Sequence, residues 1–235
     1  PIWQEKALEF YDKALPIRQE VGARSQEAST LAYIGYVYNR SQEASTLAYI
    51  GYVYSLIGKP QKALEFFEKA LPIMQEVGDR SQEASTLNNI GYVYSRIGKP
   101  QKALEFFEKA LPISQEVGDR LGEATTLDNI GAVYSRIGKP QKALEYLEKA
   151  LPISQEVGDR SGEATTLNNI GGVYSSIGQP QKALEYYEKA LPIMQEVGAR
   201  SREATTLNNI GLVYLGIGQP QKALEYYEKA LPIFQ

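Results

Sequence analysis

Apolar side chains recur along this chain at spacings of three and four residues, the pattern of helices that bury one face. One such stripe consists of Leu87, Ile90, Gly91 and Tyr94. A second stripe follows and consists of Ala103, Leu104, Phe107, Ala110 and Leu111. No stretch alternates between apolar and polar residues for long, so the pattern predicts helices and no propeller of strands.

The residues between the stripes are those that begin and end helices. Asp79 followed three residues later by Gln82 predicts a capping box at the start of the first helix. Gly98 and Pro100 predict the end of that helix and the start of the next, and the second helix ends near Gly118. Each unit is therefore predicted to be two helices joined by a tight Gly-Lys-Pro turn.

Two residues that are costly inside a helix occur in each unit. A glycine such as Gly91 costs about 1 kcal/mol relative to alanine, and we expect it where two helices approach too closely for a Cβ. Pro112 lies inside the second stripe, where proline costs about 3 kcal/mol. The helix could end at Leu111, but Ile113 and Val117 continue the apolar stripe, which favours a kinked helix that runs on.

The whole pattern repeats with a period of 40 residues. Segments 61–100 and 101–140 are identical at 34 of 40 positions, and the period continues through 141–180 and 181–220. A fixed period of this size indicates a solenoid or array in which each unit packs on its neighbours.

These residues resemble the tetratricopeptide repeat family. Gly91 and Tyr94 match the family's first-helix glycine and tyrosine, and Ala103, Phe107 and Ala110 match the small and aromatic positions of its second helix. The 40-residue unit is similar to the long form found in Pins/LGN-type, kinesin light chain-type and bacterial multi-repeat proteins. The resemblance implies an all-α, right-handed superhelical solenoid of antiparallel helix pairs, with the first helices lining a concave groove.

One place departs from the period. Residues 25–38 recur at 41–54 with only Asn39 and Arg40 between them, so 24 residues, a whole second helix, are missing. The array over 1–235 then divides into a partial repeat at 1–24 (a second helix only), an irregular junction at 25–59 and regular repeats at 60–235. Either the helix is truly absent, or it has been left out between positions 39 and 40.

If the helix is truly absent, no proline or glycine interrupts 36–50 and one helix can span about 25–57. At about 100° per residue, an offset of 16 residues turns the second apolar stripe by roughly 160°. Such a rod exposes a stripe on one side, which favours a domain-swapped or isologous homodimer.

Composition excludes several function classes. Without histidine or cysteine, the chain cannot build a His–Cys zinc site, a thiolate nucleophile, a Ser–His dyad or a disulfide. The 25 basic and 28 acidic residues form no basic stripe for nucleic acid. No apolar run suits a membrane span, residues 1–20 do not resemble a signal peptide, and we expect no cofactor or metal. Because it starts at Pro1, we expect the chain to be a fragment.

The candidate site comes from the positions at which the repeats differ. The residue after the helical glycine is Tyr36, Tyr52, Tyr92, Ala132, Gly172 or Leu212, and the residue three positions earlier is Tyr33, Tyr49, Asn89, Asn129, Asn169 or Asn209. A spacing of three places both on one helix face. The resemblance implies a concave peptide-binding face formed by Asn88, Asn89, Tyr92, Asp128, Asn129, Arg136, Asn168, Asn169, Asn208 and Asn209. The alternative is that the asparagines hydrogen-bond between neighbouring repeats, and both roles can coexist.

Other charged residues recur on helix faces and are predicted to be solvated, as in the pair Glu105 and Lys109. Co-chaperone repeats hold a terminal carboxylate with lysines, whereas Ser85, Thr125 and Thr165 stand among the matching positions here. The predicted function is a cytoplasmic, non-enzymatic scaffold that binds an extended peptide or a partner protein. The alternative is a structural or self-assembling array, natural or consensus-derived, with no dedicated ligand.

Overall fold

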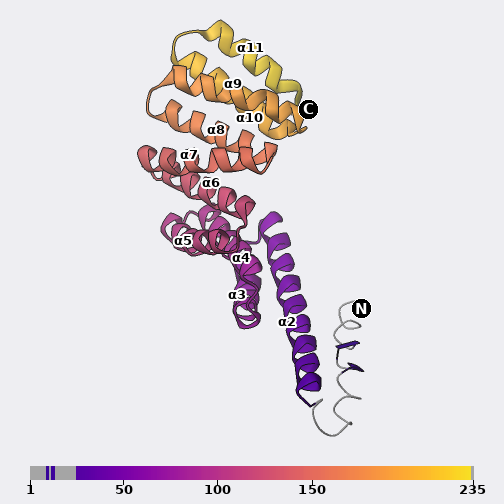
Figure 1. Ribbon diagram of the computed structural model, residues 1–235. Helices are drawn as coiled ribbons and strands as arrows, with labels where there is room; N and C mark the ends of the chain where they lie inside the picture. The colour runs from indigo at the N-terminus through magenta and orange to yellow at the C-terminus, as the bar shows by residue number, and fades with distance from the viewer. Residues whose placement is uncertain (1–8, 11, 14–24, 234–235) are drawn as a thin grey trace. The chain divides into compact units, whose positions relative to one another are not determined.

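A computed structural model describes residues 9–10, 12–13 and 25–233 of the chain. Within these ranges the chain forms ten α-helices, one short 3-10 helix and no strand, which confirms the all-α prediction. The second helix predicted within 1–24 lies almost wholly outside the described residues. The fold divides into two compact units, Pro1–Lys99 and Pro100–Gln235 (Figure 1).

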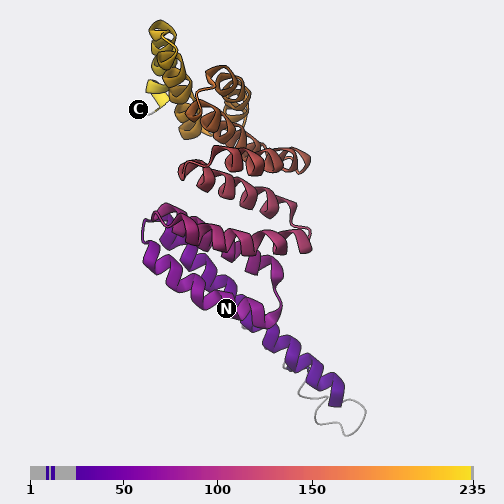
Figure 2. The ribbon, with the colours of Figure 1, turned by 90° about the vertical axis from the view of Figure 1, so that its left-hand side faces the viewer.

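The first unit contains α2 (Ser25–Leu56), α3 (Pro60–Val77) and α4 (Arg80–Arg96). α3 packs against both α2 and α4. α2 is a single helix of 32 residues that runs through Asn39 and Arg40, so the predicted fused helix is present. Its N-terminal end extends beyond α3 (Figures 1 and 2).

The second unit contains α5 (Pro100–Glu116), α6 (Arg120–Arg136), α7 (Pro140–Glu156), α8 (Arg160–Ser176), α9 (Pro180–Glu196), α10 (Arg200–Gly216), α11 (Pro220–Ala230) and the 3-10 helix η1 (Leu231–Ile233). Each helix packs against the next one in the sequence. The first helices of successive repeats also touch, α6 against α8 and α8 against α10. First helices and second helices therefore form two layers, which is the arrangement of a helix-pair solenoid.

The core lies between these layers and uses the same positions in each repeat. Tyr187 of α9 is only 3% exposed and packs with Ile210 and Val213 of the following helix, α10. On its other side Tyr187 meets the helical glycine of α8: a Cβ on Gly171 would lie 2.8 Å from two ring carbons of Tyr187. The prediction that the helical glycine permits close helix approach is confirmed.

Helix caps hold the chain at the predicted turns, with one difference. The backbone N–H of Gln82 donates to the Asp79 carboxylate at 3.1 Å, as half of a capping box requires. The Gln82 side chain does not return to Asp79; its amide donates to the Ser45 hydroxyl of α2 at 2.8 Å. The predicted reciprocal box is therefore replaced by a bond between first helices. Gly98, with φ +72°, ends α4 as predicted.

The second helices continue through their prolines. α5 includes Pro112 and ends at Glu116, so the helix does not end at Leu111. α11 is the exception, because its α-helical part ends at Ala230 and Pro232 lies in η1. In the other second helices, Ile113 and its counterparts are buried, and this burial offsets part of the cost of the proline.

Some charged residues are buried, contrary to the prediction that they form solvated faces. Glu123 is only 7% exposed, and its counterparts Glu83, Glu163 and Glu203 are 4%, 7% and 4% exposed. Its carboxylate pairs with Arg120 and accepts a bond from the Gln115 amide at 2.9 Å. A buried charge needs such partners. Gln115 lies at the end of α5 and Arg120 at the start of α6, on either side of the turn that joins the two helices. The pair of Glu65 and Lys69, 2.7 Å apart, does lie in solvent as predicted.

Candidate functional site

The predicted site residues lie along the first helices α4, α6, α8 and α10. The paired positions 88–89, 128–129, 168–169 and 208–209 are half-buried in every repeat. Tyr92 and Arg136 are exposed. Asn88, Asn89 and Tyr92 belong to the first unit, and the other predicted site residues belong to the second.

In the first unit, a groove of about 380 Å³ lies between the first helices α2 and α4. It is lined by Ala48, Tyr49, Tyr52, Gln82, Ser85, Thr86 and Asn89. The two tyrosines are 69% and 48% exposed, so their rings form an open aromatic wall opposite the amide of Asn89. Large exposed aromatic side chains beside amide and hydroxyl groups are typical of surfaces that bind protein partners.

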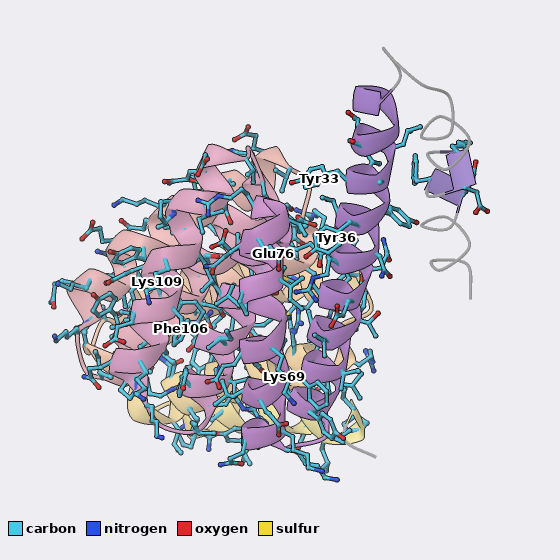
Figure 3. The ribbon with its side chains drawn as sticks, turned by 90° about the horizontal axis from the view of Figure 1, so that it is seen from below. Tyr33, Tyr36, Lys69, Glu76, Phe106 and Lys109 are labelled. Carbon is cyan, nitrogen blue, oxygen red and sulfur yellow. The ribbon has the colours of Figure 1, made fainter. Side chains whose placement is uncertain are left out.

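A different part of α2, nearer its N-terminal end, faces α3. There the Tyr36 hydroxyl and the Arg40 guanidinium both bond to the Glu76 carboxylate, the guanidinium at 3.0 Å (Figure 3). These hydrogen bonds hold the pKa of the Glu76 carboxyl below its usual range. Tyr36 and its neighbour Tyr33 therefore lie away from the groove lined by Tyr49 and Tyr52.

Tyr92 does not line this groove. It lies beside a smaller pocket of about 270 Å³ at the ends of α2 and α4, together with Arg96. The Arg96 guanidinium is 5.9 Å from the centre of the Tyr92 ring and donates to the Tyr92 hydroxyl at 3.3 Å. This contact gives the Tyr92 ring a cationic neighbour on the same helix.

In the second unit, polar side chains of the first helices form hydrogen bonds between neighbouring repeats. The Asn169 amide of α8 donates to both carboxylate oxygens of Asp128 on α6, at 3.1 and 3.2 Å. The Asn209 amide of α10 donates to the Asn168 carbonyl at 3.4 Å, and Thr206 donates to the same oxygen at 3.0 Å. These four bonds join neighbouring repeats, as expected if the asparagines hold the array together.

Asp128 is the one carboxylate at a position that is asparagine in the other regular repeats. Packing removes its carboxyl from water, and this desolvation raises its pKa from 3.8 to about 6. Hydrogen bonds from Thr166 and Asn169 and the charge of Arg202 oppose that rise. The second unit therefore carries one weakly acidic group among the asparagines of its first helices.

The inter-repeat bonds use only part of each amide. Asn169 and Asn209 donate through their NH₂ groups in these bonds, whereas Asn168 accepts through its carbonyl. An asparagine offers two donors and a carbonyl with two lone pairs, so hydrogen-bonding capacity remains for a peptide backbone. Peptide binding by these asparagines stays a prediction.

Sequence reasoning misses part of the groove in the first unit. Tyr49 and Tyr52 stand out as variable positions, but they are not among the predicted site residues, and neither are Gln82 and Ser85. The signal is present in the sequence, because only the α2 copies carry tyrosine where the later repeats carry asparagine. Their joint position depends on how α2 packs beside α4, which the repeat pattern does not show.

Metal-binding clusters and membrane-spanning helices are both absent from the described ranges. No group of three or more Asp or Glu side chains is placed to hold a metal ion in residues 9–10, 12–13 and 25–233. None of the helices described in these ranges is long and apolar enough to cross a membrane.

Comparison with known proteins identifies the repeat. The tetratricopeptide repeat model matches residues 42–116, 82–156 and 162–235. No curated protein matches the chain. Solved structures with the same fold include BtubC (BKLC) from P. vanneervenii, with 24% identity, a TM-score of 0.74 and coverage of 98% of this chain and 89% of that one.

Two further structures share the fold at lower identity. A Rap protein complexed with competence and sporulation factor has 16% identity and a TM-score of 0.75, and the match covers 98% of this chain and 76% of that one. Repeats of a putative kinesin light chain from Podosopora anserina have 19% identity and a TM-score of 0.66, with coverage of 83% and 95%. The repeat-model matches cover most of this sequence, and the chain therefore belongs to the tetratricopeptide repeat family.

Proposed function

We propose that this chain is a non-enzymatic interaction module that binds an extended segment of a partner protein along its first-helix face. Tetratricopeptide repeats generally mediate protein–protein interaction, and the Rap structure named above is a complex with a factor. The observation that carries the proposal is the groove between α2 and α4, where Tyr49 and Tyr52 stand in solvent opposite Asn89. A cytoplasmic location is part of the proposal and can be tested by cell fractionation.

The chemistry of the groove defines the ligand class. Tyrosine rings supply flat apolar surface at a low cost in side-chain entropy, and they suit apolar or aromatic side chains of a peptide. Asn89, Gln82 and Ser85 supply donors and acceptors for its backbone. In the second unit, the amides of Asn169 and Asn209 support the same role.

A displayed library of random peptides, selected against the 235-residue chain, tests the proposal. We expect binders whose affinity falls at least tenfold when Tyr49→Ala and Tyr52→Ala are combined, because aromatic anchors dominate such interfaces. Tyr33→Ala is the matched control: Tyr33 is 65% exposed and lies in an identical sequence on α2, but 16 positions earlier and outside the groove. A library that yields no binder, or binders insensitive to the tyrosine pair, contradicts the proposal.

A second candidate function is self-association, as the sequence suggested in the form of a domain-swapped homodimer. The observation that favours it is the exposure of apolar side chains on α2, among them Val53 at 52% and Leu56 at 66%. Large exposed apolar surface on a folded protein marks a contact surface. Light scattering over a range of concentrations tests this candidate, which requires a mass above that of one chain, 26.1 kDa.

A further inference from the structure

One face of α2 is exposed where the same face of the regular first helices is covered. Ile50, Val53 and Ile57, here called the bare face of α2, are 36%, 52% and 57% exposed. The residues at the first two of these positions in α4, α6, α8 and α10 are at most 5% exposed; these are Ile90, Val93, Ile130, Val133, Ile170, Val173, Ile210 and Val213. Because the residue types are the same, the difference lies in what packs against them.

In the regular repeats this face is covered by the second helix that comes just before it in the sequence. Ile210 and Val213 of α10 pack against Ala183 and Tyr187 of α9. The helix that would cover the bare face of α2 in the same way is the one that the sequence lacks in the middle of α2. The bare face is therefore one half of the interface that joins successive repeats.

The second helix that follows α2 in the sequence, α3, occupies a different side of it. A Cβ on Gly51 would lie 2.9 Å from two ring carbons of Phe67 on α3, just as a Cβ on Gly171 would meet the Tyr187 ring of α9. α3 therefore stands to α2 as α9 stands to α8, and it leaves Ile50 and its neighbours exposed. Covering the bare face requires a further helix.

The residues of α9 that cover α10 define what that further helix must carry. Ala183, Leu184, Tyr187 and Leu191 lie at i, i+1, i+4 and i+8, spacings that place them on one side of a helix. Ala183 is wholly buried, Tyr187 is 3% exposed, and the two leucines pack against the same cluster. The complement of the bare face is an amphipathic helix with a small residue, an aromatic residue and two leucines at these spacings.

We propose that the bare face of α2 binds such an amphipathic helix from a partner protein, with the aromatic residue of that helix seated on Ile50 and Val53. The contact would reproduce the packing already present between α9 and α10. Recognition of a helix through anchors one turn apart is a recurring mode of protein binding. The proposal is independent of peptide binding in the groove of Tyr49 and Tyr52, and it competes with self-association for the same apolar residues.

A labelled synthetic peptide of residues 180–196, the sequence of α9, is the probe. Its Glu185 and Lys189 side chains are exposed and 2.6 Å apart in the chain, so a lactam can join them and hold the peptide helical. A preformed helix binds without the cost of ordering, so failure to bind cannot be assigned to an unfolded peptide. We expect fluorescence anisotropy to show saturable binding of this peptide to the 235-residue chain.

Two variants of the chain test which face of α2 is used. Val53→Asp should weaken peptide binding at least tenfold, because it places a charge in an apolar contact. Leu56→Asp is the matched control: Leu56 is 66% exposed on the same helix, but its counterparts Arg96 and Arg136 are exposed in the regular repeats as well. Both substituted side chains are more than half exposed, so each variant should fold, which circular dichroism checks.

Two variants of the peptide test which side of the helix is recognised. Leu184→Asp alters the side that covers α10, and it should weaken binding at least tenfold. Met194→Asp is the matched control, because Met194 packs in the opposite direction, against Ala164 and Leu167 of α8. The peptide with Met194→Asp should bind the chain as tightly as the unmodified one.

Three results would overturn the proposal. The first is the absence of saturable binding by the lactam peptide at about 1 mM. The second is an equal loss of binding in Val53→Asp and Leu56→Asp, or in the two peptide variants. The third is a second copy on the bare face, seen in light scattering as a mass above 26.1 kDa that Val53→Asp lowers and the peptide does not.

Discussion

The close approach between first and second helices can be tested at two adjacent glycines of α8. A Cβ added at Gly171 would lie 2.8 Å from Cδ1 and Cε1 of the Tyr187 ring and 3.2 Å from the Ala183 carbonyl oxygen. A Cβ added at Gly172 would meet only the Tyr187 hydroxyl, at 3.7 Å, which is ordinary contact. The two positions share a helix and a cooperative unit, so they form a matched pair.

The expected energies follow from two opposing effects. Replacing a helical glycine by alanine stabilises the helix by about 1 kcal/mol at either position. At Gly171 the new methyl must displace a buried ring held between two helices, which costs about 1–3 kcal/mol. Gly172→Ala should therefore raise the free energy of unfolding by about 1 kcal/mol, and Gly171→Ala should leave it unchanged or lower it by up to about 2 kcal/mol.

Thermal and urea unfolding followed by circular dichroism would measure the difference. For a domain of this size, 2 kcal/mol between the variants corresponds to roughly 4–8 °C in Tm. Equal gains in Tm for the two variants would refute the argument that Gly171 is present because a Cβ does not fit. A loss at Gly171 that exceeds the gain at Gly172 would agree with it, since displacing the ring can cost more than the alanine contributes to the helix.

Three other predictions follow from single features. Ala199 caps α10 without a side-chain bond, so Ala199→Asp should add about 1 kcal/mol of stability in urea unfolding; no gain would contradict the capping role described for Asp79. Because burial raises the pKa of Asp128 from 3.8 to about 6, the unfolded state ionises first, and stability should fall as pH rises from about 4 to about 6. Asp128→Asn should remove this slope, with the two proteins differing least below about pH 4; parallel pH profiles would refute the shift. Replacing Asn39 and Arg40 by a copy of residues 55–80 should restore the missing second helix, cover Ile50 and Val53 of α2 and raise Tm. If calorimetry gives an unchanged Tm, covering these residues of α2 with a second helix does not stabilise the protein.

Local features of the fold were predictable because they depend on few neighbouring residues. The stripe through Leu87, Ile90 and Tyr94 fixed the helical period, and Gly98 with Pro100 fixed the turn. The continuation of α5 through Pro112 followed from the apolar residues beyond it. The fused helix α2 was predictable as well, since no helix breaker interrupts 36–50.

Features that depend on distant partners were not predictable in the same way. The burial of Glu123 depends on Gln115 and Arg120 converging on it, whereas its sequence context is that of a surface charge. The Gln82 side chain bonds Ser45, 37 positions away, rather than the nearby backbone expected from the capping box. Packing between repeats determines these hydrogen-bond partners, because a buried polar group bonds to the partner that packing brings within reach.

The sequence by itself determined the helix pairs, their order and the positions that face the core, because a 40-residue unit copied along the chain imposes the same local preferences each time. Tertiary structure decided which copies of a given residue are covered. Ile50 and Ile90 occupy the same place in their repeats, yet one is 36% exposed and the other 1%. The physical reason is that a side chain is buried only where a complementary helix packs against it. Identical residues therefore differ in exposure when one of them lacks that helix.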